Sequence, residues 1–136
     1  IYTVSYTLSL HDALPILAFL GRRSAVLASP LVPDLKAQYA AIREAAAEVL
    51  IVLLGTPAEA GAARAALRLP FPVLADPDGR AHERFGADRA GSRPAIYVAD
   101  RFGEIHFAAH PGGPAQIPTA LDLLGWLNYI ELLCPE

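Results

Sequence analysis

The chain contains one cysteine, and its position limits the sulfur chemistry that the sequence can support. Cys134 follows the last predicted helix and begins the run Cys134-Pro135-Glu136. If the next residue of the parent gene product were a cysteine, the two thiols would form a pair that cycles between dithiol and disulfide or contributes to a zinc site. The alternative is that Cys134 is a small buried apolar side chain. Both interpretations stay open, and a single cysteine excludes an internal disulfide framework.

The histidines and aspartates do not predict a metal site. His106 and His110 are four residues apart, but we place them in a strand and in the loop after it, so they do not share a helical face, and no carboxylate or thiol cluster accompanies them. We expect His82 to be solvated in a polar helical turn. Three aspartates are interpreted as turn formers that bond their own backbone, namely Asp76, Asp78 and Asp100. We therefore predict no metal and no cofactor.

The first sixteen residues have the features of a cloning or sequencing scar. Residues 7–16 (TLSLHDALPI) read, codon by codon, as one translation frame of a common short-read sequencing adapter, and residues 1–6 fit the bases upstream of it. We therefore treat residues 1–16 as adapter-derived and expect them to pack poorly. The native sequence is expected to run from residue 17 to residue 136 as one domain, truncated at both ends.

Composition restricts the class of protein. The chain has 54% hydrophobic and 18% charged residues, a net charge of −3 and a pI near 5.8. This is the balance of a globular domain with a buried core. Because the arginines are scattered along an acidic chain, nucleic acid is not an expected partner. The apolar run at residues 13–20 is too short to span a bilayer. We expect no membrane partner and take the cytoplasm as the default location, while the oligomeric state stays open.

The pattern of apolar runs and caps predicts the order βαβαβα followed by ββα. Strands are expected at residues 24–29, 49–54, 71–75, 95–99 and 104–108, and helices at 33–48, 57–67 and 80–85. Thr56 is expected to cap the helix over residues 57–67. A last helix, capped by Thr119, carries an apolar stripe of Leu121, Leu124, Leu127 and Ile130. Because the closing hairpin adds antiparallel strands to parallel ones, the fold class is α/β, with a central mixed sheet and helices on both faces.

Two stretches of this pattern resemble a known family. Residues 71–79 (FPVLADPDG) and 93–105 (RPAIYVADRFGEI) are similar in order and spacing to the redoxins, in particular the alkyl hydroperoxide reductase-type peroxiredoxins. The resemblance covers most of residues 17–136. It implies a thioredoxin-like fold and an antioxidant oxidoreductase activity in cell redox homeostasis.

The resemblance also implies roles for two neighbouring residues. In the family, the proline that matches Pro94 is cis and lies against the active-site thiol; the alternative is an ordinary trans proline entering a strand. Arg93 matches the arginine that helps to activate the thiolate, and the alternative is a solvated loop arginine. A thiol reductant protein or a peptide is the partner implied at the groove beside Pro94.

The cysteine that this chemistry needs is missing from its usual place. The family's thiol lies at the N-terminus of the first helix, where the dipole stabilises the thiolate. We align that site with residues 29–35, so that Val32 and Leu35 stand where a Cys-x-x-Cys pair would be, and Ser29 has no base in view. Two hypotheses follow. The chain is a catalytically silent redoxin module, or its intact parent is a thiol oxidoreductase that uses Cys134 and a second cysteine beyond Glu136.

Overall fold

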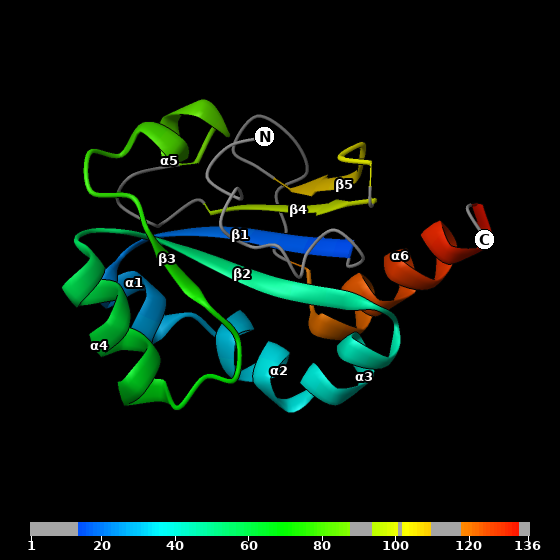
Figure 1. Cartoon of the computed structure of the whole chain (residues 1–136), viewed down its shortest axis with the longest axis horizontal. Helices are drawn as coiled ribbons and strands as arrows, with labels where there is room; N and C mark the ends of the chain where they lie inside the picture. Colours follow the sequence, from blue (N-terminus) through cyan, green and yellow to red (C-terminus); the bar gives the residue numbers. More distant parts are fainter. Residues whose placement is uncertain (1–13, 88–93, 101, 110–117, 134–136) are drawn as a thin grey trace.

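A mixed sheet of five strands organises the chain (Figure 1). The computed structural model describes residues 14–87, 94–100, 102–109 and 118–133. The sheet order is β3-β2-β1-β4-β5, in which β1 to β3 are parallel and β4 and β5 are antiparallel to their neighbours. The strands are β1 (Leu14–Arg22), β2 (Ala47–Leu54), β3 (Val73–Ala75), β4 (Ala95–Ala99) and β5 (Ile105–Ala109).

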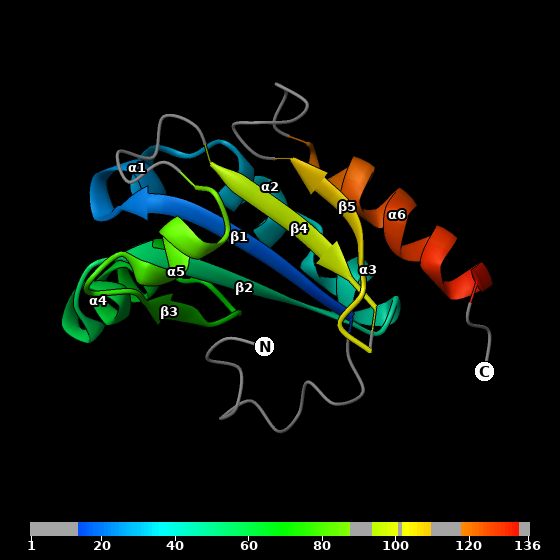
Figure 2. The same cartoon turned by 90° about the horizontal axis from the view of Figure 1, so that it is seen from above.

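The described helices cover the two faces of the sheet unequally (Figures 1 and 2). One face carries α1 (Arg23–Ala28), α2 (Leu31–Ala37), α3 (Tyr39–Glu44), α4 (Pro57–Leu67) and α6 (Ala120–Leu133), and the other carries the short α5 (Arg80–Arg84). Side chains alternate along each strand, so Ile16 and Ala18 of β1 enter the larger core while Leu17 and Phe19 enter the smaller one. The predicted α/β, thioredoxin-like class with helices on both faces is confirmed.

The first strand lies earlier than the sequence indicated. Residues 24–29 were predicted to be a strand, but they fall largely in α1, where Val26 alone is buried. The first strand of the structure is instead β1, which begins at Leu14. Its first three residues, Leu14 to Ile16, belong to the segment assigned to the adapter. Leu14 is 4% exposed and Ile16 is fully buried, so the expectation of poor packing is wrong for these residues. Residues 1–13 lie outside the described part, and the origin of the segment stays a prediction.

The predicted helix over residues 33–48 is two helices and the start of a strand. The chain leaves helical geometry at Gln38, between α2 and α3, and Ala46 has a left-handed φ of 61° before β2 begins. Leu35 on α2 and Ile42 on α3 are both fully buried. Asp34 links α2 to α6, because its Oδ2 accepts the N–H of Ala120 at 2.8 Å.

Helix caps were predicted well, whereas the buried face of the last helix was predicted in part. Thr56 and Glu59 form a capping box on α4, and Thr119 accepts the N–H of Asp122 at 3.1 Å at the start of α6. The buried residues of α6 are Ala120, Leu123, Leu127 and Ile130, so Leu127 and Ile130 were placed correctly. Leu121 is 67% exposed, which corrects the predicted stripe. None of the helices in the described ranges has both the length and the apolar character that crossing a bilayer requires.

Candidate functional site

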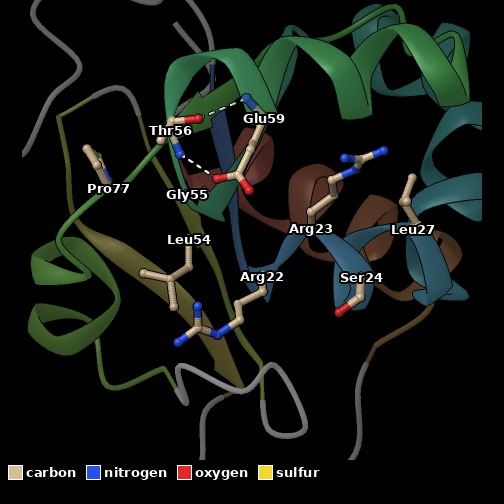
Figure 3. A pocket seen from close by; sticks show the side chains of 9 residues that line it. All are labelled: Arg22, Arg23, Ser24, Leu27, Leu54, Gly55, Thr56, Glu59 and Pro77. Atoms are coloured by element: carbon tan, nitrogen blue, oxygen red, sulfur yellow. Dashed lines mark hydrogen bonds between the residues drawn. The ribbon is translucent and has the colours of Figure 1, made fainter.

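A cleft of about 560 Å³ opens at the carboxyl ends of β1 and β2 (Figure 3). In α/β sheets, ligands bind outside the carboxyl ends of the parallel strands, and pockets of about 300–1,000 Å³ hold small ligands. This cleft is therefore the candidate site. Its walls come from the β1–α1 junction, the β2–α4 junction and the segment after β3, with the residues Arg22, Arg23, Ser24, Leu27, Leu54, Gly55, Thr56, Glu59 and Pro77.

The cleft combines two exposed cations with one restrained carboxylate. Arg22 and Arg23 form no ion pair with any residue of the described ranges, and Figure 3 shows their guanidinium groups on different sides of the cleft. Glu59 is held in the α4 cap, where its Oε1 accepts the Thr56 N–H at 2.9 Å. A Cβ on Gly55 would come within 2.4 Å of that oxygen, so glycine leaves room for the cap. The cleft thus presents positive charge in two places.

The structure places the segment aligned with the missing thiols away from this cleft. The helix that follows β1 is α1, so Arg23 and Ser24 occupy the junction where residues 29–35 were expected. Val32 and Leu35 lie in α2 and are 1% and 0% exposed inside the core. The Ser29 Oγ accepts the N–H of Leu31 at 3.3 Å. None of these three residues lines the cleft, and the junction residues that do line it carry no sulfur.

Pro94 lies at the same end of the sheet as the cleft. Ala95 pairs with Phe19 in the antiparallel β1–β4 ladder, which puts Pro94 beside the last residues of β1. Pro94 is partly exposed. Arg93 lies outside the described residues, so the cis geometry of the Arg93–Pro94 bond and the role of Arg93 stay predictions. Cys134 and His110 also lie outside the described part.

His82 is buried, which corrects the expectation that it is solvated. Its side chain is 0% exposed, and its Nδ1 lies 2.9 Å from Oδ2 of Asp76, whose side chain is 2% exposed. Nε2 accepts the backbone N–H of Gly21 at 2.9 Å, a contact between residues 61 positions apart. Sequence reasoning missed this link because the contact to β1 is not local. The signal that could have found the pair is an aspartate six residues before the histidine.

The Asp76 carboxylate also caps α5. It accepts the N–H of Ala81 at 3.1 Å and the N–H of His82 at 2.8 Å, in addition to the His82 ring. Burial by itself raises the pKa of Asp76, but these hydrogen bonds outweigh it and hold the pKa below the ordinary value. Asp76 is therefore ionised at neutral pH. The turn-forming role predicted for Asp76 is confirmed, and its carboxylate also pairs with the buried His82 side chain.

A second aspartate–histidine pair lies in the β4–β5 hairpin. Asp100 Oδ1 accepts the N–H groups of Phe102 and Glu104, both at 2.9 Å, and Oδ2 lies 3.0 Å from His106 Nε2. A carboxylate therefore does accompany His106, contrary to the sequence interpretation. Asp100, Glu104 and His106 bring ligand atoms within 4.8 Å of one another, and they are the set in the described ranges that could hold a cation. The hydrogen bonds already account for their arrangement.

Comparisons with known proteins agree with this geometry. The model of the AhpC/TSA family matches residues 6–108. The structure of a reduced 2-Cys peroxiredoxin from Plasmodium vivax superposes with a TM-score of 0.76 at 14% identity, covering 96% of this chain and 84% of that chain. AhpC from Enterococcus faecalis superposes with a TM-score of 0.71 at 21% identity, covering 91% of this chain and 78% of that chain.

A putative thiol:disulfide interchange protein DsbE from Chlorobium tepidum also matches, with a TM-score of 0.67 at 18% identity over 90% of this chain and 82% of that chain. No curated protein sequence matches the chain. At these identities the structural neighbours establish the fold, while the family model establishes the relationship. This chain belongs to the AhpC/TSA family.

Proposed function

We propose that this chain is a redoxin domain that does not itself reduce peroxides and that binds a partner segment at the cleft beside Pro94. The observation that carries the proposal is the absence of sulfur from the β1–α1 junction, where Arg22, Arg23 and Ser24 line the cleft. Peroxide or disulfide reduction needs a thiolate at the site. Ser24 is exposed and forms no hydrogen bond with a described carboxylate or imidazole, and the Glu59 carboxylate of the same cleft is held in the α4 cap. No side chain at the junction therefore replaces the thiol.

The proposed partner is an extended segment rich in carboxylates. Arg22 and Arg23 offer guanidinium groups on two sides of the cleft, and guanidinium groups pair well with carboxylates. Leu27, Leu54 and Pro77 add apolar side chains to the lining of the same cleft. A neutral or basic segment would leave both cations unpaired.

A peroxide-consumption assay with an added dithiol reductant tests the catalytic part of the proposal. We expect no turnover above the rate of reductant and peroxide alone, both for the chain and for a Cys134→Ser variant. Turnover by the chain that disappears in the Cys134→Ser variant would overturn the proposal. Turnover that persists in the variant would also overturn it, because a residue other than cysteine would then be reacting.

The second candidate function is thiol-dependent reduction that uses Cys134. It is favoured by Cys134-Pro135-Glu136, which directly follows the end of α6 at Leu133. The end of α6 lies on the opposite side of the molecule from α1 and α4, whose junctions form the cleft (Figures 1 and 2). The same Cys134→Ser comparison in the peroxide assay decides it.

Binding is tested by NMR titration of the labelled chain with a glutamate-rich decapeptide, against a serine-rich decapeptide. The acidic peptide should shift the amides of Arg22, Arg23 and Thr56 and bind more tightly. Each exposed ion pair contributes up to about 1 kcal/mol, so the double change Arg22→Ala with Arg23→Ala should weaken binding about tenfold. Arg43→Ala, on α3, is the matched control and should have no effect. Equal binding of both peptides contradicts the proposed partner.

A further inference from the structure

One hydrogen bond ties α5 to the strand that leads into the cleft. Gly21 donates its N–H to Nε2 of His82 at 2.9 Å, and both groups are buried. α5 lies on the opposite face of the sheet from α1, so the contact reaches the β1–α1 junction from behind (Figure 1). Phe19 packs edge-on against the His82 ring, with 5.6 Å between ring centroids. The imidazole is therefore enclosed on the β1 side.

The partners of the ring define its protonation state. Because Gly21 N–H is a donor, Nε2 must present its lone pair, and the proton of a neutral imidazole must then be on Nδ1. Nδ1 faces Asp76 Oδ2 at 2.9 Å, which accepts that proton in a hydrogen bond. Each ring nitrogen thus has one partner of the right kind. The arrangement requires a neutral ring with its proton on Nδ1.

Gly21 occupies a special position in β1. Its φ is 87°, and the pairing of β1 with β2 shifts register between Phe19 and Gly21. Arg22 and Arg23, which line the cleft, follow at once. A left-handed glycine at a bulge has several accessible conformations, and a bond to its N–H selects one of them. The His82 contact therefore sets the direction in which the chain enters the cleft.

We propose that His82 is a positioning residue for the cleft and that a proton added to its Nε2 releases the β1–α1 junction. The proton comes from solvent and forms an N–H bond at the atom that now accepts from Gly21. Two N–H donors would then face each other, so the Gly21 bond breaks while the ring keeps its contact with Asp76. The junction at Gly21, Arg22 and Arg23 becomes free to change conformation. Acid therefore acts on the cleft through α5.

The charged groups around the ring are consistent with this sequence of events. Asp76, from the turn between β3 and α5, contacts the ring and would pair with the imidazolium. The charged residues of α5 itself, Arg80, Glu83 and Arg84, are exposed. β1 contributes Phe19, the Gly21 backbone and the exposed Arg22. On β4, Tyr97 contacts Phe19 and Phe85 and bonds the carbonyl of Phe85.

The test follows the nitrogen-15 and proton resonances of the Gly21 amide and of the histidine rings between about pH 7.5 and about pH 4.5. We expect the His82 ring to carry its proton on Nδ1 at neutral pH. On acidification, the Gly21 amide should shift with the same midpoint as His82 Nε2, and the amides of Arg22, Arg23 and Ser24 should follow. This readout needs no ligand, so its result is separate from that of the peptide titration.

Two variants make the test specific. In His82→Gln the side-chain amide still offers an acceptor and a donor but takes up no proton, so the Gly21 amide should lose its acid transition. His106→Gln removes the other paired histidine and should leave the transition unchanged. The proposal is overturned if the Gly21 transition persists in His82→Gln or is lost in His106→Gln. The proposal is also overturned if the Gly21 amide of the unsubstituted chain does not shift on acidification, whether His82 gains a proton or stays neutral over the whole pH range. These outcomes are measured on the unsubstituted chain, so they decide the proposal even if His82→Gln does not fold.

Discussion

The chain contains the same short pattern twice, and the two copies have different structural consequences. The pattern Asp-x-x-Gly-x-x-His occurs at residues 76–82 and again at residues 100–106. In both copies the glycine has a positive φ, 75° at Gly79 and 88° at Gly103, and the aspartate binds backbone N–H groups and the histidine. The turn chemistry is therefore shared, and any difference must come from what surrounds it.

The difference lies in which ring nitrogen the aspartate takes. Asp76 binds Nδ1 of His82, so Nε2 points away from the turn and reaches β1. Asp100 binds Nε2 of His106, so that pair stays within its own hairpin. Burial follows the same order: the His82 side chain is 0% exposed and that of His106 is 16% exposed. The turn makes a long-range contact only where the aspartate binds Nδ1 of the histidine, because Nε2 can then bind another element of the fold.

The largest effect should come from removing the two aspartates. Asp76→Ala leaves the N–H groups of Ala81 and His82 and the ring N–H of His82 without acceptors in the core. Since each buried unsatisfied group costs about 1–3 kcal/mol, the free energy of unfolding should fall by about 3–5 kcal/mol. Asp100→Ala affects a more accessible turn and should cost about half as much. Urea denaturation of both variants measures this, and equal losses would show that burial does not separate the two copies.

Acid should weaken both copies, with a smaller effect. Burial raises the pKa of each aspartate, but hydrogen bonds from the paired histidine and from backbone N–H groups outweigh it, so both are held below their ordinary value of 3.8. A lowered pKa in the folded state means that the stabilisation is complete above the ordinary value and is lost as pH falls through the folded value. Unfolding free energy should therefore decline below about pH 4.

The acid dependence can be divided between the copies by measuring urea denaturation at several pH values. Asp100→Ala should keep the part of the acid dependence that is due to Asp76. Its unfolding free energy should therefore still decline in acid, but less steeply than that of the unsubstituted chain. If the unfolding free energy of Asp100→Ala declined in acid as steeply as that of the unsubstituted chain, Asp100 would not be stabilised in its ionised form. The Asp100 variant is the more useful of the two, because it is expected to stay folded over the range.

The success of the sequence prediction followed how local each signal was. The Thr56 cap of α4, the branched run of β2 and the strand pair of the β4–β5 hairpin depend on neighbours within a few residues. All three were predicted within two residues of their observed position. The fold class could be derived from these elements, because their order restricts the topology of the sheet.

The errors concern residues whose environment is set by distant parts of the chain. The apolar run Ala25-Val26-Leu27 suits a strand or a helix, and only the presence of β1 before it decides for the helix. His82 follows polar neighbours and gives no local sign of burial, because its partner Gly21 is on β1. The cleft was missed for the same reason: Arg22 and Arg23 gain meaning only once the ends of β1 and β2 are side by side. Candidate sites need tertiary information that element prediction does not contain.

The smallest effect, and the sharpest check on the comparison, comes from the two turn glycines. Gly79→Ala and Gly103→Ala each force an L-residue into left-handed geometry, which costs about 1–2 kcal/mol. A Cβ at Gly103 meets nothing within 4 Å, so backbone strain is the whole cost expected there. Because the turn is shared, both variants should lose similar unfolding free energy in urea, unlike the aspartate variants. Gly79 is buried whereas Gly103 is exposed. A clearly larger loss for Gly79→Ala would therefore mean that the surroundings of Gly79 resist the added Cβ, and the two copies would then differ in the packing around their turns as well as in their rings.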